Sequence, residues 1–322
     1  MSKFLVFIFV AVSFSVRGQP AEADKYFPVE ASHSYIEFSV KYMGYARFKG
    51  RFADFSGMIY YDEKNLEKLS ATITVKVESI DTDVDFRDED LKSENWFDAK
   101  KFPYITFTSS KVVPTTAGFD VTGDLTVKGI TKEVVVHLGK PSGVVKDVRS
   151  DDQLIMSGIT RINRLDFGIE GKNWSGIKEG VTAVENDIDL EISLLGKQWK
   201  ISNWKGRFQN KQAPATMVYD ALVAKGDAAG IAEFKRIKDE MKLNEFPLIN
   251  AAYMLQLEGR MNDAIVLLEE NQRTFPESSK ANFELAMAYL RKGDRQKAKE
   301  SFQHSLQKDQ NNAHATEVLR HL

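Results

Sequence analysis

The chain of 322 residues contains no cysteine. This absence excludes disulfide bonds, zinc sites built from thiolates, catalytic thiols and a lipidated N-terminal cysteine. Stability must therefore come from buried apolar surface, and the chain is long enough to bury a sizeable core. Its length is also that of about two domains.

An excess of charge of either sign is missing as well. The chain has 44 Lys and Arg residues against 46 Asp and Glu residues, which gives a formal net charge of -2. Nucleic-acid-binding proteins normally have a basic surface and a high pI. The composition therefore argues against a nucleic-acid partner.

The sequence also lacks motifs for catalysis or metal binding. His33 and His137 are far apart and the other three histidines follow residue 300, so we expect no metal site of clustered histidines and carboxylates. The acidic run at residues 81–90 lacks the glycine and terminal glutamate of an EF-hand loop. The sequence has no Gly-x-Ser-x-Gly motif, and residues 171–176 do not follow the Walker pattern. We expect no catalytic residue, no cofactor and no enzymatic activity.

Long hydrophobic runs are absent except at the N-terminus. Lys3 precedes the apolar residues 4–14, and mostly polar residues follow up to Gln19, which is the pattern of a secretory signal peptide. About eleven apolar residues are too few to span a bilayer, which takes roughly 20. We predict that residues 1–18 are a signal peptide, that the protein is exported, and that it has no integral membrane segment. A buried helix or an uncleaved anchor is the alternative.

Residues 34–195 show the two-residue period of β-strands. Ile36, Phe38 and Val40, for example, alternate with polar residues. Turn residues separate the runs, and residues 128–131 predict a tight hairpin. About eight strands with short connections predict an antiparallel meander, either a sandwich or a closed barrel. The many phenylalanines on the apolar faces favour a barrel, whose interior is either filled by side chains or open to one small ligand.

Residues 87–107 interrupt this alternation. The segment begins with a short, polar, helix-compatible stretch whose acidic residues suit a helix start, and it continues into Trp96, Phe97 and Phe102. We expect it to form a short helix at one end of the barrel with these aromatic rings turned inward. Its composition suggests no hinge, which favours a plug over a gate.

Several segments of this region carry a family resemblance in the correct order. They are residues 33–40, 48–57, 79–82, 87–107, 123–131 and 161–168. Together they resemble the YceI-like family over about residues 26–196, with a departure at Lys41 and Tyr42, where many members have a histidine. The resemblance implies a lipocalin-like antiparallel barrel, exported to the bacterial periplasm, that binds a long isoprenoid lipid or quinone in its lumen.

An isoprenoid chain would need a dry, apolar tunnel with few polar groups near its mouth. We expect the lumen to be lined by Phe38, Val40, Phe48, Phe52, Phe55, Ile73, Val75, Trp96, Phe97, Phe102, Phe107, Leu125, Val136, Ile188, Leu190 and Ile192. Arg161 and Arg164 interrupt a strand-like segment. They either contact a polar head group or form a salt bridge to the acidic segment at residues 87–107.

The period becomes helical beyond Ala215. Gly259 and Gly293, like Ala264 and Ala298, are 34 residues apart, and this period is that of tetratricopeptide repeats. Residues 280–313 resemble the repeat well, residues 246–279 fairly, and residues 215–242 form a degenerate first unit. The tail either offers a groove to a peptide or partner protein, or packs on the barrel and stabilises it.

We therefore predict a signal peptide (1–18), a YceI-like barrel (24–196), a linker (197–213) and tetratricopeptide-like repeats (214–322). The predicted function is that of an exported, non-enzymatic protein, periplasmic or secreted, that binds or sequesters an isoprenoid lipid or quinone and engages a protein partner through its repeats. The alternative is a structural or interaction protein in which the barrel core is filled and only the repeats bind.

Overall fold

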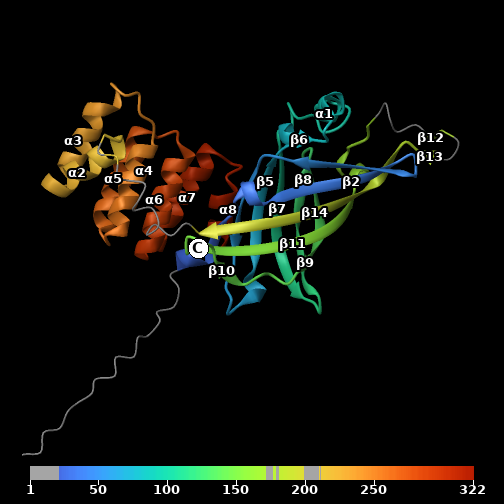
Figure 1. The fold of residues 1–322 in the computed structure, drawn as a ribbon, viewed down its shortest axis with the longest axis horizontal. Coiled ribbons are helices and arrows are strands. Elements are labelled where there is room, and N and C mark those ends of the chain that lie inside the picture. Colours follow the sequence, from blue (N-terminus) through green and yellow to red (C-terminus); the bar gives the residue numbers. More distant parts are fainter. Residues whose placement is uncertain (1–21, 172–176, 179–180, 199–209, 211) are drawn as a thin grey trace, which may run out of the picture.

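The computed structural model describes residues 22–171, 177–178, 181–198, 210 and 212–322. An antiparallel β-structure forms the N-terminal part and helices form the C-terminal part (Figure 1). The predicted signal peptide and most of the predicted linker lie outside the described residues.

The strands of the β-structure pair antiparallel throughout. Its strands are β1 (Tyr26–Pro28), β2 (Tyr35–Tyr42), β3 (Ala46–Phe52), β4 (Phe55–Tyr60), β5 (Ser70–Lys76), β6 (Ile80–Asp81), β7 (Tyr104–Pro114), β8 (Gly118–Val127), β9 (Ile130–Gly139), β10 (Val144–Lys146), β11 (Asp152–Asn163) and β14 (Val184–Gln198), with β12 (Ile177–Lys178) and β13 (Val181–Thr182) in a separate small hairpin. β1 and β2 together act as one bent strand, and so do β3 with β4 and β5 with β6. β1 and β2 are hydrogen-bonded to β4 and β3, respectively, and β3 and β4 are hydrogen-bonded to β6 and β5.

The sheet closes into a barrel. The last long strand, β14, pairs with β11 on one side and with β2 on the other, and a bridge between Val29 and Gly196 continues this seam. If each bent strand is counted once, the wall has about eight strands, which is the number in small barrels that hold one ligand. The lipocalin-like barrel predicted from the sequence is confirmed.

One end of the barrel is solid. Phe27, Ile59 and Leu154 are at most 1% exposed and belong to one apolar cluster inside the wall. Elsewhere in the wall, glycines let large rings lie against neighbouring strands: a Cβ atom at Gly50 or Gly123 would collide with the ring of Phe38 or Phe107, respectively. We call the packed end, with Phe27, Ile59 and Leu154 at its centre, the floor.

The segment between β6 and β7 covers the opposite end. It contains helix α1 (Asp85–Lys92), as expected, followed by turns up to Pro103. The buried carboxylate of Asp88 accepts hydrogen bonds from the backbone amide and the hydroxyl of Thr82, which ties the helix start to β6. The indole Nε1 of Trp96 donates to Asp90 at 2.9 Å. These bonds hold α1 and its aromatic residues against the barrel.

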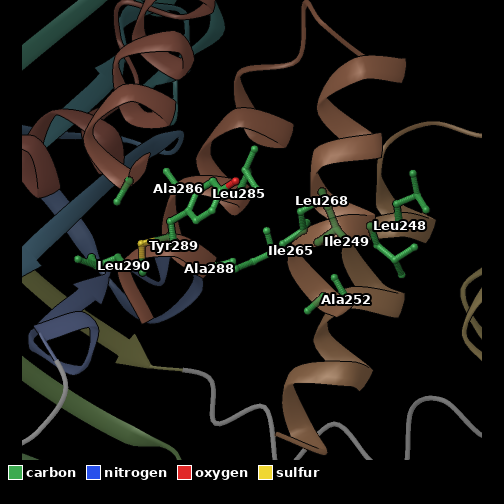
Figure 2. Close-up of a cluster of buried hydrophobic side chains, with 14 of the residues drawn as sticks. Leu248, Ile249, Ala252, Ile265, Leu268, Leu285, Ala286, Ala288, Tyr289 and Leu290 are labelled. Carbon is green, nitrogen blue, oxygen red and sulfur yellow. The ribbon is translucent and has the colours of Figure 1, made fainter. Parts of the chain in front are cut away.

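The tail consists of three helix pairs and a final helix. They are α2 (Pro214–Lys225) with α3 (Asp227–Lys238), α4 (Phe246–Leu257) with α5 (Met261–Thr274), α6 (Ser279–Lys292) with α7 (Arg295–Lys308), and α8 (Ala313–Arg320). Side chains of α4, α5 and α6 meet in one continuous apolar core (Figure 2). Ala264 and Ala298, one repeat apart, are fully buried. The helical repeat architecture is confirmed.

The tail packs directly on the outer wall of the barrel (Figure 1). Met58 and Tyr60 on β4 point outward and join the apolar core of the helices. The ring of Tyr60 stacks on His321, with centroids 3.9 Å apart. Of the two roles considered for the tail, packing against the barrel is therefore present in the structure.

A buried carboxylate fixes this interface. Glu317 on α8 is fully buried and accepts hydrogen bonds from the hydroxyls of Ser70 and Thr72 on β5. It also pairs with Arg320, at the end of the same helix, at 2.9 Å and with the following residue, His321, at 3.1 Å. Burial raises the pKa of Glu317, but the bond to His321, the charge of Arg320 and the two hydroxyls outweigh this effect, so the net pKa is lowered.

Replacement of Glu317 should weaken the protein in a pH-dependent way. We expect Glu317→Ala to lower the free energy of unfolding at pH 7 by about 3 kcal/mol, because buried partners are left unpaired. Since the folded-state pKa lies below the unfolded value of about 4.3, this stabilisation is complete above that value and is lost as the pH falls through the folded-state pKa. The difference between wild type and variant should therefore shrink in acid.

Urea unfolding measured between pH 3 and pH 7 checks this expectation. The matched control is Glu277→Ala, which removes an exposed ion pair with Lys308 and should cost less than about 1 kcal/mol. A Glu317→Ala effect that equals the control, or that grows in acid, would contradict the assigned role.

Candidate functional site

A cavity of about 600 Å³ occupies the barrel between the floor and α1. Its walls are almost entirely aliphatic and aromatic, and its few polar groups include Thr82, Arg87 and Asp90 at the α1 end and Arg164. The barrel interior is thus packed at the floor and hollow beneath α1, so the alternative of a completely filled core does not hold.

Most of the residues expected to line the lumen surround this cavity. They are Phe38, Val40, Phe48, Phe52, Ile73, Val75, Trp96, Phe97, Phe107, Leu125, Val136, Ile188, Leu190 and Ile192, and Arg164 joins them. The strand period explains the convergence of those that lie on strands, because residues two apart point to the same face, whereas Trp96 and Phe97 reach the cavity from the turns after α1. Their role in holding a ligand stays a prediction.

Phe55, Phe102 and Arg161 lie elsewhere. Phe55 is buried in the apolar cluster of the barrel but outside the cavity lining, because it sits at the start of β4. The ring of Phe102 packs against Gly129 in the turn between β8 and β9. Arg161 is on the outward face of β11 and bonds Asp189 at 2.5 Å. Arg161 therefore forms a salt bridge across the outer wall, neither touching the cavity nor reaching residues 87–107.

Sequence reasoning missed about half of the wall. Further lining residues include Ile36, Tyr42, Ile105, Val121, Val134, Leu138, Met156, Ile162, Ile169, Val184 and Leu194. Many of them lie on strands, where the same alternation of apolar and polar residues indicates an inward-facing side chain. Phe86 and Arg87 could not be found this way, since they face the cavity from a helix.

Arg87 offers a positive charge at the α1 end of the cavity. Its Nε and Nη2 atoms donate to the hydroxyl and the carbonyl of Thr82 at 2.8 and 2.7 Å. Its guanidinium lies over the ring of Phe48, 4.9 Å from the centroid. Among the described residues no carboxylate pairs with Arg87, and no acceptor is found for the N–H groups of its Nη1 atom, which could therefore donate to a ligand.

Arg164 is a second cation at the cavity, and it is only 3% exposed. It donates to the carbonyls of Ile169, Glu170, Val184 and Glu185 at 2.5–3.2 Å, and it lies 5.5 Å from the ring centre of Trp96. Burial lowers its pKa, although an arginine stays charged in proteins. Because most of its donors are engaged, Arg164 ties the loop after β11 to β14 and leaves a single Nη2 hydrogen for a ligand.

The described part of the chain holds no group of three or more histidines and carboxylates arranged to bind a metal ion. None of the helices in this part is both long enough and apolar enough to cross a bilayer.

The fold and the cavity define a lipocalin-like barrel with an apolar lumen, joined to a helical-repeat domain. Residues 27–196 match the YceI-like domain, and residues 255–322 match the tetratricopeptide repeat. The first match covers more than half of the chain. The chain belongs to the YceI-like family.

Proteins from three bacteria are similar to parts of this chain. Protein YceI of Escherichia coli O157:H7 is 31% identical over 192 residues, which make up 60% of this chain and 95% of that protein. The structure of Burkholderia cenocepacia BcnA is 25% identical and covers 52% of this chain and 99% of its own, with a TM-score of 0.45. The structure of a polyisoprenoid binding domain from Saccharophagus degradans is 15% identical and covers 55% of this chain and 99% of its own, with a TM-score of 0.40.

Enlarging side chains should distinguish the open from the packed end of the barrel. We expect Ile59→Phe, in the floor, to lower the free energy of unfolding by about 1–3 kcal/mol, because a filled core must distort to admit extra atoms. The matched change Ile192→Phe, beside the cavity, should cost less than about 1 kcal/mol, since its added atoms enter empty space. Urea unfolding of the two variants tests the difference, and equal losses would show that the cavity is closed in solution.

Proposed function

We propose that this protein is an exported carrier that holds one long isoprenoid lipid or quinone in its barrel and engages a protein partner through its helical repeats. The supporting observation is the apolar cavity of about 600 Å³, whose volume lies within the range of about 300–1,000 Å³ typical of small-molecule sites. An isoprenoid chain makes no hydrogen bonds. Its affinity must come from apolar surface removed from water, at roughly 25 cal/mol per Å².

The two ends of the cavity suggest an orientation for the ligand. The floor end is apolar, with Leu154 and Phe27 behind it. The α1 end carries Arg87, whose Nη1 group faces no protein acceptor among the described residues. In the proposed complex the hydrocarbon chain points to the floor, and an oxygen of the head group accepts a hydrogen bond from Arg87. Quinone carbonyls and phosphate oxygens both meet this requirement.

The proposal assigns binding, and no chemical step, to the cavity. Its polar side chains already serve the protein: Asp90 accepts from Trp96, and the hydroxyl of Thr82 lies between Asp88 and Arg87. None of these groups is positioned as a nucleophile with an adjacent base.

Export and the protein partner rest on other parts of the chain. Residues 1–18 carry the features of a signal peptide, which supports a periplasmic or secreted location. In the tail, α6 and α8 make prominent contacts with the barrel region. We assign the partner-binding role to the repeats formed by α2–α5, farther from the barrel (Figure 1).

Filling the lumen should prevent lipid binding. We expect the wild-type protein, purified from a bacterial periplasm, to carry an isoprenoid detectable by native mass spectrometry and by organic extraction. Val136→Trp combined with Ile192→Trp should reduce the bound fraction at least about tenfold, because the added rings occupy the space of the chain. The control Ile130→Trp, at an exposed position outside the cavity lining, should retain the lipid. A wild-type protein free of lipid under several growth conditions would refute the proposal.

Removal of the cation at the α1 end should weaken head-group recognition selectively. We expect Arg87→Met to raise the Kd for a quinone or isoprenyl phosphate about tenfold or more, since a hydrogen bond from a charged donor contributes about 1.5–3 kcal/mol. Binding of squalene, an isoprenoid hydrocarbon without a head group, should not change. Arg51→Met, which removes an exposed pair with Asp81, serves as control. Equal weakening of both ligands by Arg87→Met would mean that Arg87 only supports the fold.

A further inference from the structure

Four large side chains stand exposed beside the α1 end of the cavity, and we call them the apolar rim. They are Met43 (41% exposed), Tyr45 (95%), Phe48 (37%) and Phe86 (77%). Phe48 and Phe86 also line the cavity. The ring of Tyr42, which lines the cavity too, lies 5.1 Å from that of Phe48. Apolar surface is therefore continuous from the interior of the barrel to its outside.

The backbone holds the rim in place. Met43 and Gly44, in the three-residue connection between β2 and β3, have positive φ angles of 52° and 74°, as the central residues of a tight hairpin turn do. The backbone amide of Tyr45 closes this turn by donating to the carbonyl of Tyr42 at 3.2 Å. Phe86 lies in the first turn of α1. The next residue, Arg87, is held by a hydrogen bond to the hydroxyl of Thr82. The exposure of Tyr45 and Phe86 is thus built into ordered elements.

The helical tail leaves this part of the barrel uncovered. The last helix, α8, packs on β4 and β5, whereas α1 and the turn end of β2 lie away from the helices (Figure 1). No contact between the rim and the tail is found in the described part of the chain.

The charges near the rim do not select for an anionic surface. Basic side chains on β2, β3 and α1 include Lys41, Arg47, Lys49 and Arg87, and acidic ones on or just before α1 include Asp83, Asp85 and Glu89. Glu185 on β14 adds a further carboxylate, 3.9 Å from Lys41. Arg47 is already paired with Asp189 at 2.6 Å. Since the signs are nearly balanced, attraction to this region must come mainly from its apolar side chains.

We infer that the apolar rim inserts into the interface of a lipid bilayer and that the lipid passes between bilayer and cavity across it. This inference rests on the proposed function, because an isoprenoid resides in membranes and is almost insoluble in water. Exposed aromatic residues at a cavity mouth suit the bilayer interface. Phe48 and Phe86, which belong to both the rim and the cavity, would give the chain an apolar path that avoids water.

A local fluorescent probe tests the inference. The chain contains no cysteine, so Tyr45→Cys supplies a single attachment point for an environment-sensitive dye, and Val148→Cys, at a fully exposed position outside the rim, supplies the control. We expect phosphatidylcholine vesicles to shift the emission at position 45 to the blue and to leave that at position 148 unchanged. The local signal separates rim insertion from any membrane binding by the apolar residues 4–14, which both proteins share.

Substitutions supply the second arm. Phe86→Ser combined with Met43→Ser, in the Tyr45→Cys labelled protein, should lower partitioning of position 45 into vesicles about tenfold. Val113→Ser combined with Val148→Ser, at exposed apolar positions outside the rim, should leave it unchanged. A tenfold increase in salt should alter the signal less than about twofold, because the contact is apolar.

The outcomes separate the inference from the proposed function. A blue shift at position 45 that is lost with the rim substitutions supports membrane insertion. An unshifted emission on phosphatidylcholine vesicles, in a protein that does carry an isoprenoid, overturns the inference and leaves the proposed function intact. A shift that requires membrane proteins and disappears after their proteolysis overturns it in favour of a protein partner. The proposed function fails separately, if no lipid is extracted from the wild-type protein.

Discussion

The two faces of each barrel strand determine how this protein is built, and β5 shows the constraint most clearly. Ile73 and Val75 point inward and line the cavity, whereas Ser70 and Thr72 point outward and bind the carboxylate of Glu317 on α8. A single strand therefore serves as the wall of a lumen and as the base on which the helical tail rests. The period of two residues along a strand makes both roles compatible.

Much of the barrel and its cavity could be predicted from the sequence, because both follow from local alternation. Phe38, Val40, Leu190 and Ile192 reach the cavity as that pattern requires. The tail was predictable for a similar reason, since small and large residues recur with the period of the repeat, as Ala264 and Ala298 do. Arg161 stood out because it interrupts a strand-like segment, but both roles expected of it were wrong: its position on β11 directs it outward to Asp189.

Other features depend on tertiary geometry that no local pattern records. Phe55 shares the alternation of its neighbours and pairs directly with Val75 on β5, yet only Val75 reaches the cavity. The packing of the tail on β4 and β5 depends on Glu317, which lies more than 240 residues along the chain from its partners Ser70 and Thr72. Arg87 belongs to the segment that breaks the alternation, but its place beside Phe48 depends on how α1 lies over the barrel. Contacts between segments that are distant in the sequence could not be predicted from local patterns.

The central claim is that the open half of the barrel holds an isoprenoid chain with its head at α1. A crystal structure of the protein purified from a bacterial periplasm without delipidation tests this claim most directly. The account predicts continuous tubular electron density that runs from the Nη1 atom of Arg87 to the floor at Leu154, with no ordered water along it. A cavity that contains only ordered water, or that is closed by inward movement of Phe38 and Phe107, would contradict it.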